Sequence, residues 1–246
     1  MKKSEEAKKY LKENKKRLLE QFASLDKYPS TEKPFSIFMA GSPGAGKTET
    51  SKGLIESGLI EKLVSFKCDG GIVRIDDDEI RSFFGDIGYD GTNTDIFKSA
   101  SNVGVEKIFD FSLNKKQNII LDNTFSNYKK SRDNVKRSLD KDRSVGIFYL
   151  YIDPIVAWNF TIKRSDEEGR SIPEDFFVES LFKAKDNVNQ IKKEFGSQIE
   201  LTLIERLYNN DKDVNRFEVK INLNIDSVDN HLKMKYTKQS LISKIC

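Results

Sequence analysis

Short apolar runs alternate along this chain with longer segments whose apolar residues recur at helical spacing. Runs of four to eight apolar residues suit strands that are covered on both faces of a sheet. Such runs occur at Phe35–Ala40, Ile72–Ile75, Asn118–Leu121, Val145–Ile152 and Ile199–Ile204. A further extended run, Phe217–Leu223, comes near the end of the chain. Together they predict a sheet of five to six strands.

The longer segments predict helices between and around these strands. The predicted helices are Glu5–Leu25, Glu49–Ile55, Ile96–Asn114, Asn127–Leu139, Pro154–Arg164, Glu174–Phe195 and Tyr236–Ile245. A polar turn, Ser165–Arg170, separates the fifth helix from the sixth. Strands that alternate with helices are joined by right-handed crossovers. The chain is therefore predicted to be an α/β protein with a mostly parallel sheet flanked by helices.

The first 33 residues differ in character from the rest of the chain. Glu5–Leu25 has an apolar stripe and a basic face, and Pro29 and Pro34 in the following linker end the helix. We expect the stripe to pack on the flank of the sheet; the alternatives are a cover over a ligand cleft or attraction to a phosphate-bearing or membrane surface. The predicted organisation is a helix and linker over 1–33 and one domain over 34–246, with a lid around 164–174.

The strongest functional signal lies in one loop after the first strand. Gly41-Ser42-Pro43-Gly44-Ala45-Gly46-Lys47-Thr48 is a full match to the pattern G-x-x-x-x-G-K-[ST]. Its glycines allow backbone N–H groups to converge on phosphate oxygens at a helix N-terminus. Lys47 is expected to reach the β- and γ-phosphates, and the Thr48 hydroxyl to bind Mg²⁺. Residues 41–48, with Thr50, are thus predicted to bind ATP in a P-loop NTPase or kinase fold.

Acidic residues follow the next two strands. Asp76-Asp77-Asp78-Glu79 comes after the second strand, and Asp122-Asn123-Thr124 comes after the third. Ligands of open parallel sheets bind beyond the carboxyl ends of the strands. Beside a nucleotide loop, such acids can bind Mg²⁺ and accept the proton of an attacking hydroxyl. The ordinary alternatives are a solvated helix cap for the first stretch and an Asx turn for the second.

Two arginines lie where a lid is expected. Phosphoryl transfer spreads negative charge over the moving group, and lid arginines can neutralise this charge while excluding water. Arg164 ends a predicted helix, and Arg170 follows Gly169 in a turn with hinge-like freedom. Surface ion pairs with Asp166–Glu168 are the ordinary alternative. We predict that both arginines stabilise the transferred charge.

Composition narrows the chemistry. A net charge of +3 over 246 residues argues weakly against a dedicated nucleic-acid binder. The single histidine, His231, lies far from every motif, so a general base must be a carboxylate. Cys68 and Cys246 lack both metal-ligand spacing and the number needed for a disulfide framework. No apolar run has the length of a membrane span and no signal peptide is apparent, so we expect a cytoplasmic protein.

The motifs resemble those of the zeta toxins of bacterial toxin–antitoxin systems, in the family's order, over roughly Phe35–Leu207. The phosphate loop matches, and Ile75-Asp76-Asp77-Asp78 is similar to the family's I-D-N-D stretch. Leu121-Asp122-Asn123-Thr124 resembles its I-E-G-T stretch. Thr161–Arg164 and Gly169–Pro173 resemble its two lid motifs.

This resemblance implies roles for individual residues. It makes Asp78 the general base and places Glu106, Asp122 and Thr124 at substrate-contacting positions. It implies an enzyme that uses ATP and Mg²⁺ to phosphorylate the 3′-hydroxyl of the amino sugar in UDP-N-acetylglucosamine. It further implies a small antitoxin protein as a partner.

The chain departs from the family pattern on the acceptor side. Where the family commonly has Gly-Arg after the I-E-G-T stretch, this chain has Phe125-Ser126, and Asp122 is one methylene shorter than the family's glutamate. The His-Pro that often follows the I-D-N-D helix is absent from residues 83–86. Asp78-Glu79-Ile80-Arg81 also resembles polynucleotide kinases and small-molecule kinases such as chloramphenicol phosphotransferase. In that case Arg81 would hold a substrate phosphate, and otherwise it would be an exposed helix residue.

The combined prediction is transfer of the ATP γ-phosphate to a hydroxyl of a nucleotide-type substrate, with Thr48 and Asp76 at Mg²⁺. A polynucleotide, dinucleotide or other small-molecule kinase is one alternative, and nucleic acid is a partner only in that case. A non-catalytic nucleotide-binding module or toxin–antitoxin interaction protein is another. A GTP switch is disfavoured because Asn114-Lys115-Lys116-Gln117 lacks the final aspartate of a guanine-reading motif.

Overall fold

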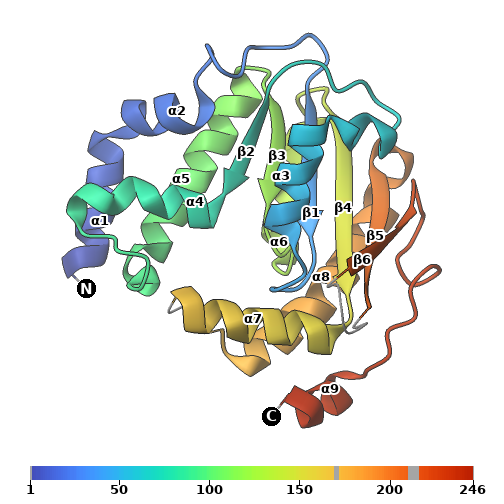
Figure 1. Cartoon of the computed structure of the whole chain (residues 1–246). Helices are drawn as coiled ribbons and strands as arrows, with labels where there is room; N and C mark the ends of the chain where they lie inside the picture. Colours follow the sequence, from blue (N-terminus) through green and yellow to red (C-terminus); the bar gives the residue numbers. More distant parts are fainter. Residues whose placement is uncertain (1, 169–171, 210–215, 246) are drawn as a thin grey trace.

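Six strands form one sheet in the order β2-β3-β1-β4-β5-β6. The strands are β1 (Phe35–Ala40), β2 (Ile72–Asp76), β3 (Asn118–Asp122), β4 (Ser144–Ile152), β5 (Glu200–Asn209) and β6 (Arg216–Asn222). The computed structural model describes residues 2–168, 172–209 and 216–245 (Figure 1). Within these residues β1 to β5 are parallel and β6 runs antiparallel to β5. The predicted mostly parallel α/β sheet is confirmed.

Helices cover both faces of this sheet (Figure 1). The α-helices are α1 (Lys2–Glu13), α2 (Lys15–Ala23), α3 (Lys47–Ser57), α4 (Asp77–Arg81), α5 (Thr94–Asn114), α6 (Tyr128–Leu139), α7 (Pro154–Glu168), α8 (Glu174–Phe195) and α9 (Lys238–Ile245). Short 3₁₀ helices are η1 (Leu59–Lys62), η2 (Ser82–Ile87) and η3 (Gly196–Gln198).

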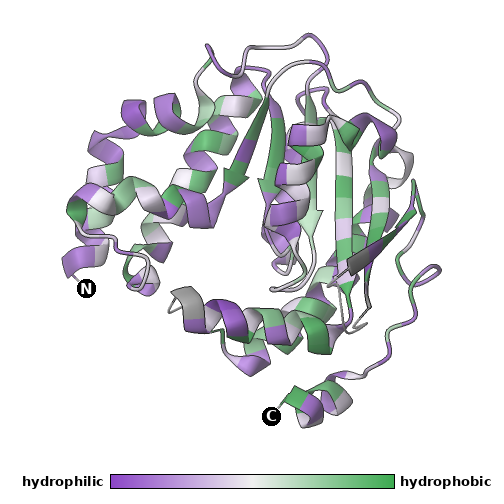
Figure 2. Ribbon diagram, viewed as in Figure 1, coloured by the Kyte–Doolittle hydropathy of each residue, from purple (hydrophilic) through white to green (hydrophobic). Residues whose placement is uncertain are grey.

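Alternate residues of the strands enter two separate cores because successive side chains of a strand point to opposite faces. In β1, Phe38 belongs to the core with α1, α2, α5 and α6, whereas Ile37 and Met39 belong to the core with α3 and α7. α8 contributes to both cores, with Leu181 in one and Val188 in the other. The central strands β1, β3 and β4 are accordingly apolar along most of their length (Figure 2).

The N-terminal segment forms two helices instead of the single helix predicted over Glu5–Leu25. The break falls at Asn14, whose side-chain amide donates to the Tyr10 carbonyl at 2.9 Å. The side chain shares this carbonyl with the Asn14 N–H. Asparagine side chains that bond to nearby backbone are unfavourable inside helices, and periodicity does not reveal this. Both helices pack on α5 with Leu11 and Leu18 buried, which agrees with the expected position on the flank of the sheet.

The region of the predicted lid is more helical than its sequence suggested. α7 continues past Arg164 to Glu168, so the first part of the predicted turn Ser165–Arg170 is helix. Gly169, Arg170 and Ser171 lie outside the described residues. The chain resumes at Ile172, just before α8 begins at Glu174.

A buried arginine joins the amino ends of two central strands. Arg143, 4% exposed, precedes β4 and donates from Nε to Ser36 Oγ at 2.7 Å. Its Nη2 donates to the carbonyls of Phe35 and Gln117. Burial lowers the pKa of Arg143 to about 10, which still leaves the guanidinium charged at neutral pH. The Arg143 side chain therefore donates to backbone oxygens at the amino ends of the strands, which is the end of the sheet opposite the phosphate loop.

We expect Arg143→Met to lower the free energy of unfolding by about 2–4 kcal/mol, because it leaves buried carbonyls without donors. Urea unfolding followed by circular dichroism measures this loss. Arg132→Met is the matched control, since Arg132 is 35% exposed where it pairs with Glu194 and should cost less than about 1 kcal/mol. Equal losses for the two variants would contradict the role given to Arg143.

Candidate active site

The loop between β1 and α3 has the form of a phosphate cradle. Gly46 is the N-cap of α3 with φ 82°, and the first helical bond joins Thr50 N–H to the Gly46 carbonyl at 3.0 Å. The N–H groups of the first turn lack helical acceptors, and the helix dipole adds positive potential there. The structure thus has the anion-binding geometry that the sequence pattern predicts.

Gly44 shows why the loop requires glycine. Its φ is 71°, and a Cβ at this position would overlap the Ala157 carbonyl and lie 2.7 Å from Thr161 Oγ1. Both of these groups belong to α7, which therefore lies directly on the loop. A movement of α7 would therefore displace the backbone of the phosphate loop.

Lys47 is folded back onto its own loop. Its Nζ donates to the carbonyls of Gly41 at 3.2 Å and Ser42 at 2.7 Å. Burial lowers the pKa of Lys47, while the negative charges of Asp122 and Asp76 act in the opposite direction. The ammonium is held by weak neutral acceptors, which a phosphate group can replace at little cost.

Asp76 and Asp122 are direct neighbours at the carboxyl ends of β2 and β3. Thr48 Oγ1 donates to Asp76 Oδ2 at 3.3 Å, and Ser51 Oγ donates to Asp122 Oδ2 at 3.3 Å. Burial raises the pKa of Asp122 to about 6, and the charge of Asp76 acts in the same direction. The strand ends thus bring together the loop hydroxyl and two of the predicted acids.

Arg74 lies between these two carboxylates and was not among the predicted site residues. Its Nη1 donates to Asp76 at 2.9 Å and Asp122 at 3.3 Å, and its Nη2 forms an ion pair with Glu79. Burial tends to lower the pKa of Arg74, but the carboxylates outweigh it and the pKa is raised. The available signal was the period of the strand, because residues two apart share a face.

The side-chain oxygens of Thr48, Asp76 and Asp122 suit Mg²⁺. Among the described residues there is no cluster of three or more histidine, cysteine or acidic side chains of the kind that encloses a metal. Mg²⁺ in nucleotide sites, however, takes one or two carboxylates with phosphate oxygens and water. Thr48 and Asp76 can supply such oxygens, with Asp122 close by. The residues present therefore fit a metal ion that arrives with its nucleotide.

Asp78 is held from two sides. The Asp76 side chain caps α4 by accepting the Asp78 N–H at 2.9 Å, which fixes Asp78 one residue into the helix. Arg81 Nη1 donates to Asp78 Oδ1 at 2.7 Å, and Arg164 Nη2 of α7 donates to Asp78 Oδ2 at 2.9 Å. The predicted base and one predicted lid arginine thus meet, although 86 residues separate them in the sequence.

Arg81 is buried, so the alternative prediction of an exposed helix residue is wrong. The residue is 6% exposed and forms ion pairs with Asp77 and Asp78. Its Nε is buried without a hydrogen-bond partner. A helix wheel could not show this, because the burial comes from η2 and α5 folding around the short α4.

The segment after Asp122 keeps a backbone shape that would suit glycine. Phe125, where the resemblance leads one to expect glycine, has φ 61°. Its ring is 2% exposed and packs against Phe38 with centroids 6.4 Å apart, and its carbonyl accepts from Asn187 at 2.9 Å. Burial of the ring thus offsets a left-handed backbone. Thr124 bonds to Ser126 at 2.8 Å and accepts the Gly41 N–H through its carbonyl at 3.3 Å.

Glu106 does not lie with the other predicted acids at the strand ends. It lies on α5 and pairs with Lys130 at 3.2 Å and Arg137 at 3.1 Å, both on α6. These residues line a cavity of about 300 Å³ together with Asn127, Lys129, Asp133 and Asn134. The structure gives no direct contact between Glu106 and the carboxylates at the strand ends, within the residues it describes.

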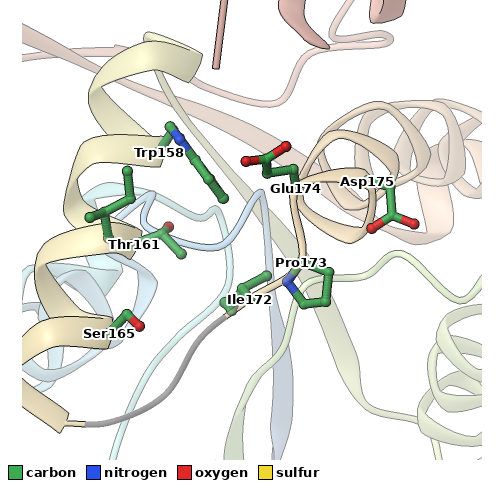
Figure 3. A pocket seen from close by; sticks show the side chains of 8 residues that line it. Trp158, Thr161, Ser165, Ile172, Pro173, Glu174 and Asp175 are labelled. Carbon is green, nitrogen blue, oxygen red and sulfur yellow. The ribbon is translucent and has the colours of Figure 1, made fainter. Parts of the chain in front are cut away.

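A second cavity, of about 550 Å³, lies between α7 and the start of α8. Figure 3 shows Trp158, Thr161 and Ser165 of α7 opposite residues 172–175 at the start of α8. Thr161 also touches the space beside Gly44. The described lining comes from α7 and from residues 172–175, so this cavity separates α7 from α8 and is not the phosphate cradle itself.

The model of the zeta toxin family matches residues 20–218 of the chain. The chain belongs to the zeta toxin family. No curated protein matches it in sequence. This family membership confirms the resemblance drawn from the motifs.

Solved structures with a similar fold include one from the PezAT chromosomal toxin–antitoxin system of Streptococcus pneumoniae. It is 20% identical with a TM-score of 0.60, over 79% of this chain and 78% of that one. The AvrRxo1-ORF1:AvrRxo1-ORF2 structure with sulphate ions is 14% identical with a TM-score of 0.60, over 92% and 70% of the two chains. Its counterpart with ATP is 15% identical with a TM-score of 0.59, over 87% and 64%. At these identities the likeness concerns the fold.

The described helices include none that is long and apolar enough to cross a membrane.

The left-handed Phe125 generates a prediction about stability. We expect Phe125→Ala to lower the free energy of unfolding by about 3–5 kcal/mol through the cavity it leaves. Phe125→Gly should lower it by about 1 kcal/mol less, because glycine adopts positive φ without strain. Chemical unfolding of both variants measures the difference.

The matched control is Phe38, which packs against the same ring from an ordinary strand position. Phe38→Gly should lower the free energy of unfolding more than Phe38→Ala does, since glycine loses more backbone freedom on folding. The same order of glycine and alanine at both sites would contradict the account of Phe125.

Proposed function

We propose that this chain is an ATP-dependent kinase whose acceptor is a hydroxyl of a nucleotide-type substrate, with UDP-N-acetylglucosamine as the first candidate. The observation that supports this most is the meeting of Thr48, Asp76 and Asp78 in front of the N-terminus of α3. A phosphate cradle, a metal-ligand pair and a carboxylate base are the parts that phosphoryl transfer to a hydroxyl needs. Family membership supports the same reading.

ATP is the proposed donor. The loop N–H groups would receive its phosphates, and Lys47 Nζ would leave the carbonyls of Gly41 and Ser42 to contact the β- and γ-phosphates. Mg²⁺, bound with Thr48 and Asp76, would neutralise charge on the phosphates. The AvrRxo1 complex with ATP shares this fold, which supports the choice of donor.

Asp78 is the proposed general base. In the structure its two carboxylate oxygens accept from Arg81 and Arg164. When the γ-phosphate is present, Arg164 has a more highly charged acceptor nearby, and its move would leave Asp78 Oδ2 to accept the proton of the acceptor hydroxyl. Arg81 would keep the carboxylate oriented. Arg170, outside the described residues, is proposed to add a second positive charge from the lid.

The acceptor is proposed to bind on the side of Asp122 and Thr124. Ser126 stands where the resemblance leads one to expect a substrate-binding arginine, so this chain must hold its acceptor with other groups. Asn127, three residues after Thr124, lines the same cavity as Glu106 and the α6 cations that pair with it, so these groups are proposed to take part in acceptor binding. A small antitoxin partner and a cytoplasmic location are part of the same proposal, in keeping with the toxin–antitoxin system of the PezAT neighbour.

Asp78→Asn should lower the rate of phosphate transfer by at least about 10²-fold while ATP binding changes less than about threefold, because the base acts on the acceptor. Transfer of radiolabelled γ-phosphate and calorimetric titration with ATP measure the two quantities. Asp77→Asn is the control: this aspartate also pairs with Arg81 but does not contact Arg164 in the described contacts. Transfer by Asp78→Asn at the wild-type rate would remove Asp78 as the base.

A direct comparison of acceptors tests the substrate class. We expect the wild-type protein with Mg²⁺ and radiolabelled ATP to phosphorylate UDP-N-acetylglucosamine and not an oligonucleotide with a 5′-hydroxyl. The reverse result would favour the polynucleotide kinase alternative. ATP binding without transfer to nucleotide sugars, oligonucleotides or dinucleotides would favour a binding module.

A further inference from the structure

Arg206 of β5 lies on the phosphate loop, although no motif in the sequence marked it. Its Nη1 donates to the Ala45 carbonyl at 3.2 Å. A Cβ at Gly46 would overlap the same Nη1, so the guanidinium lies directly beside the N-cap of α3. The side chain is partly buried, and this burial lowers the pKa of Arg206, while the charge of Glu49 in the first turn of α3 acts in the opposite direction.

The strand order places Arg206 opposite the acidic groups. β3 and β2 lie on one side of β1 and carry Asp122 and Asp76, whereas β4 and β5 lie on the other side (Figure 1). A nucleotide whose terminal phosphate faces the acidic side must direct its nucleoside toward β4 and β5. Arg206 therefore approaches the loop from the nucleoside side.

Lys47 and Arg206 thus stand at different points along the cradle. Lys47 Nζ donates to the carbonyls of Gly41 and Ser42 at the start of the loop. Arg206 Nη1 donates instead to the Ala45 carbonyl, beside the N-cap of α3. A guanidinium has five N–H donors in one plane, so it can keep a carbonyl and contact phosphate oxygens together. A cation in this place suits the phosphate that is bonded to the nucleoside.

We propose that Arg206 binds the α-phosphate of the donor nucleotide. The inference rests on the proposed ATP site and adds a donor contact from a strand that carries no motif. Arg206 would thereby favour nucleotides over short polyphosphates, because only a bound nucleotide must place a phosphate at this end of the cradle. The competing account is that Arg206 only shapes the loop through Ala45.

Calorimetric titrations of the full chain with Mg-ATP, Mg-ADP and Mg-pyrophosphate separate these accounts. Arg206→Ala should weaken ATP and ADP binding at least about tenfold, as expected for loss of a charged hydrogen bond. Pyrophosphate should lose less than about threefold, since Lys47 and the loop N–H groups can hold it at the other end. Arg206→Lys, which keeps the charge, should recover part of the affinity for both nucleotides.

Lys220→Ala is the matched control. Lys220 pairs in register with Glu205, so it lies on the face of the sheet opposite Arg206, and its removal should leave all three affinities unchanged. Equal weakening of nucleotides and pyrophosphate by Arg206→Ala would show a loop-shaping role and overturn the proposal, as would unchanged nucleotide binding. Wild-type protein that does not bind Mg-ATP would instead refute the ATP site itself.

Discussion

Two carboxylates that meet at the ends of neighbouring parallel strands set the electrostatics of this site. Asp76 and Asp122 are register partners, and both are nearly buried. Two negative charges on register partners that are nearly buried repel each other strongly, so a cation is needed between them. Arg74 supplies it. Burial nevertheless raises the pKa of Asp122 to about 6, against the positive charges of Lys47 and Arg74. The carboxylate oxygens beside the Thr48 hydroxyl make the strand ends suitable for a metal ion bound with a nucleotide.

Two cations of the site are held in the structure by acceptors that a phosphate can replace. Lys47 contacts carbonyls of its own loop, and Arg164 contacts Asp78. In the proposed reaction a bound nucleotide would replace both contacts, because phosphates are stronger acceptors than carbonyls and more highly charged than a single carboxylate. Arg164 joins the two events, since it comes from α7, the helix that also lies on Gly44. In the proposed reaction, donor binding and release of the base would thereby be linked through one helix.

The features that could be predicted from sequence are those that depend on neighbouring residues. The loop pattern, the strands and the acids that follow β2 and β3 are local, because strand ends and helix starts are set by adjacent residues. Arg74 and Arg206 were missed because their importance depends on what lies across the sheet. The break at Asn14 was missed because the apolar stripe continues through it. The positive φ of Phe125 was hidden because a phenylalanine gives no signal for a left-handed turn.

The sequence by itself determined the α/β class, the phosphate loop between β1 and α3 and the membership of the zeta toxin family. The phosphate loop rests on one short contiguous pattern, and the class and the family rest on such local patterns occurring in a fixed order along the chain. Tertiary structure alone decided which charges meet: Arg164 with Asp78, Arg74 with Asp122, Glu106 with α6 and Arg206 with the loop. The reason is the strand order, because crossovers bring residues that are far apart in the sequence together at the carboxyl ends of the strands. Periodicity along the chain does not indicate that order.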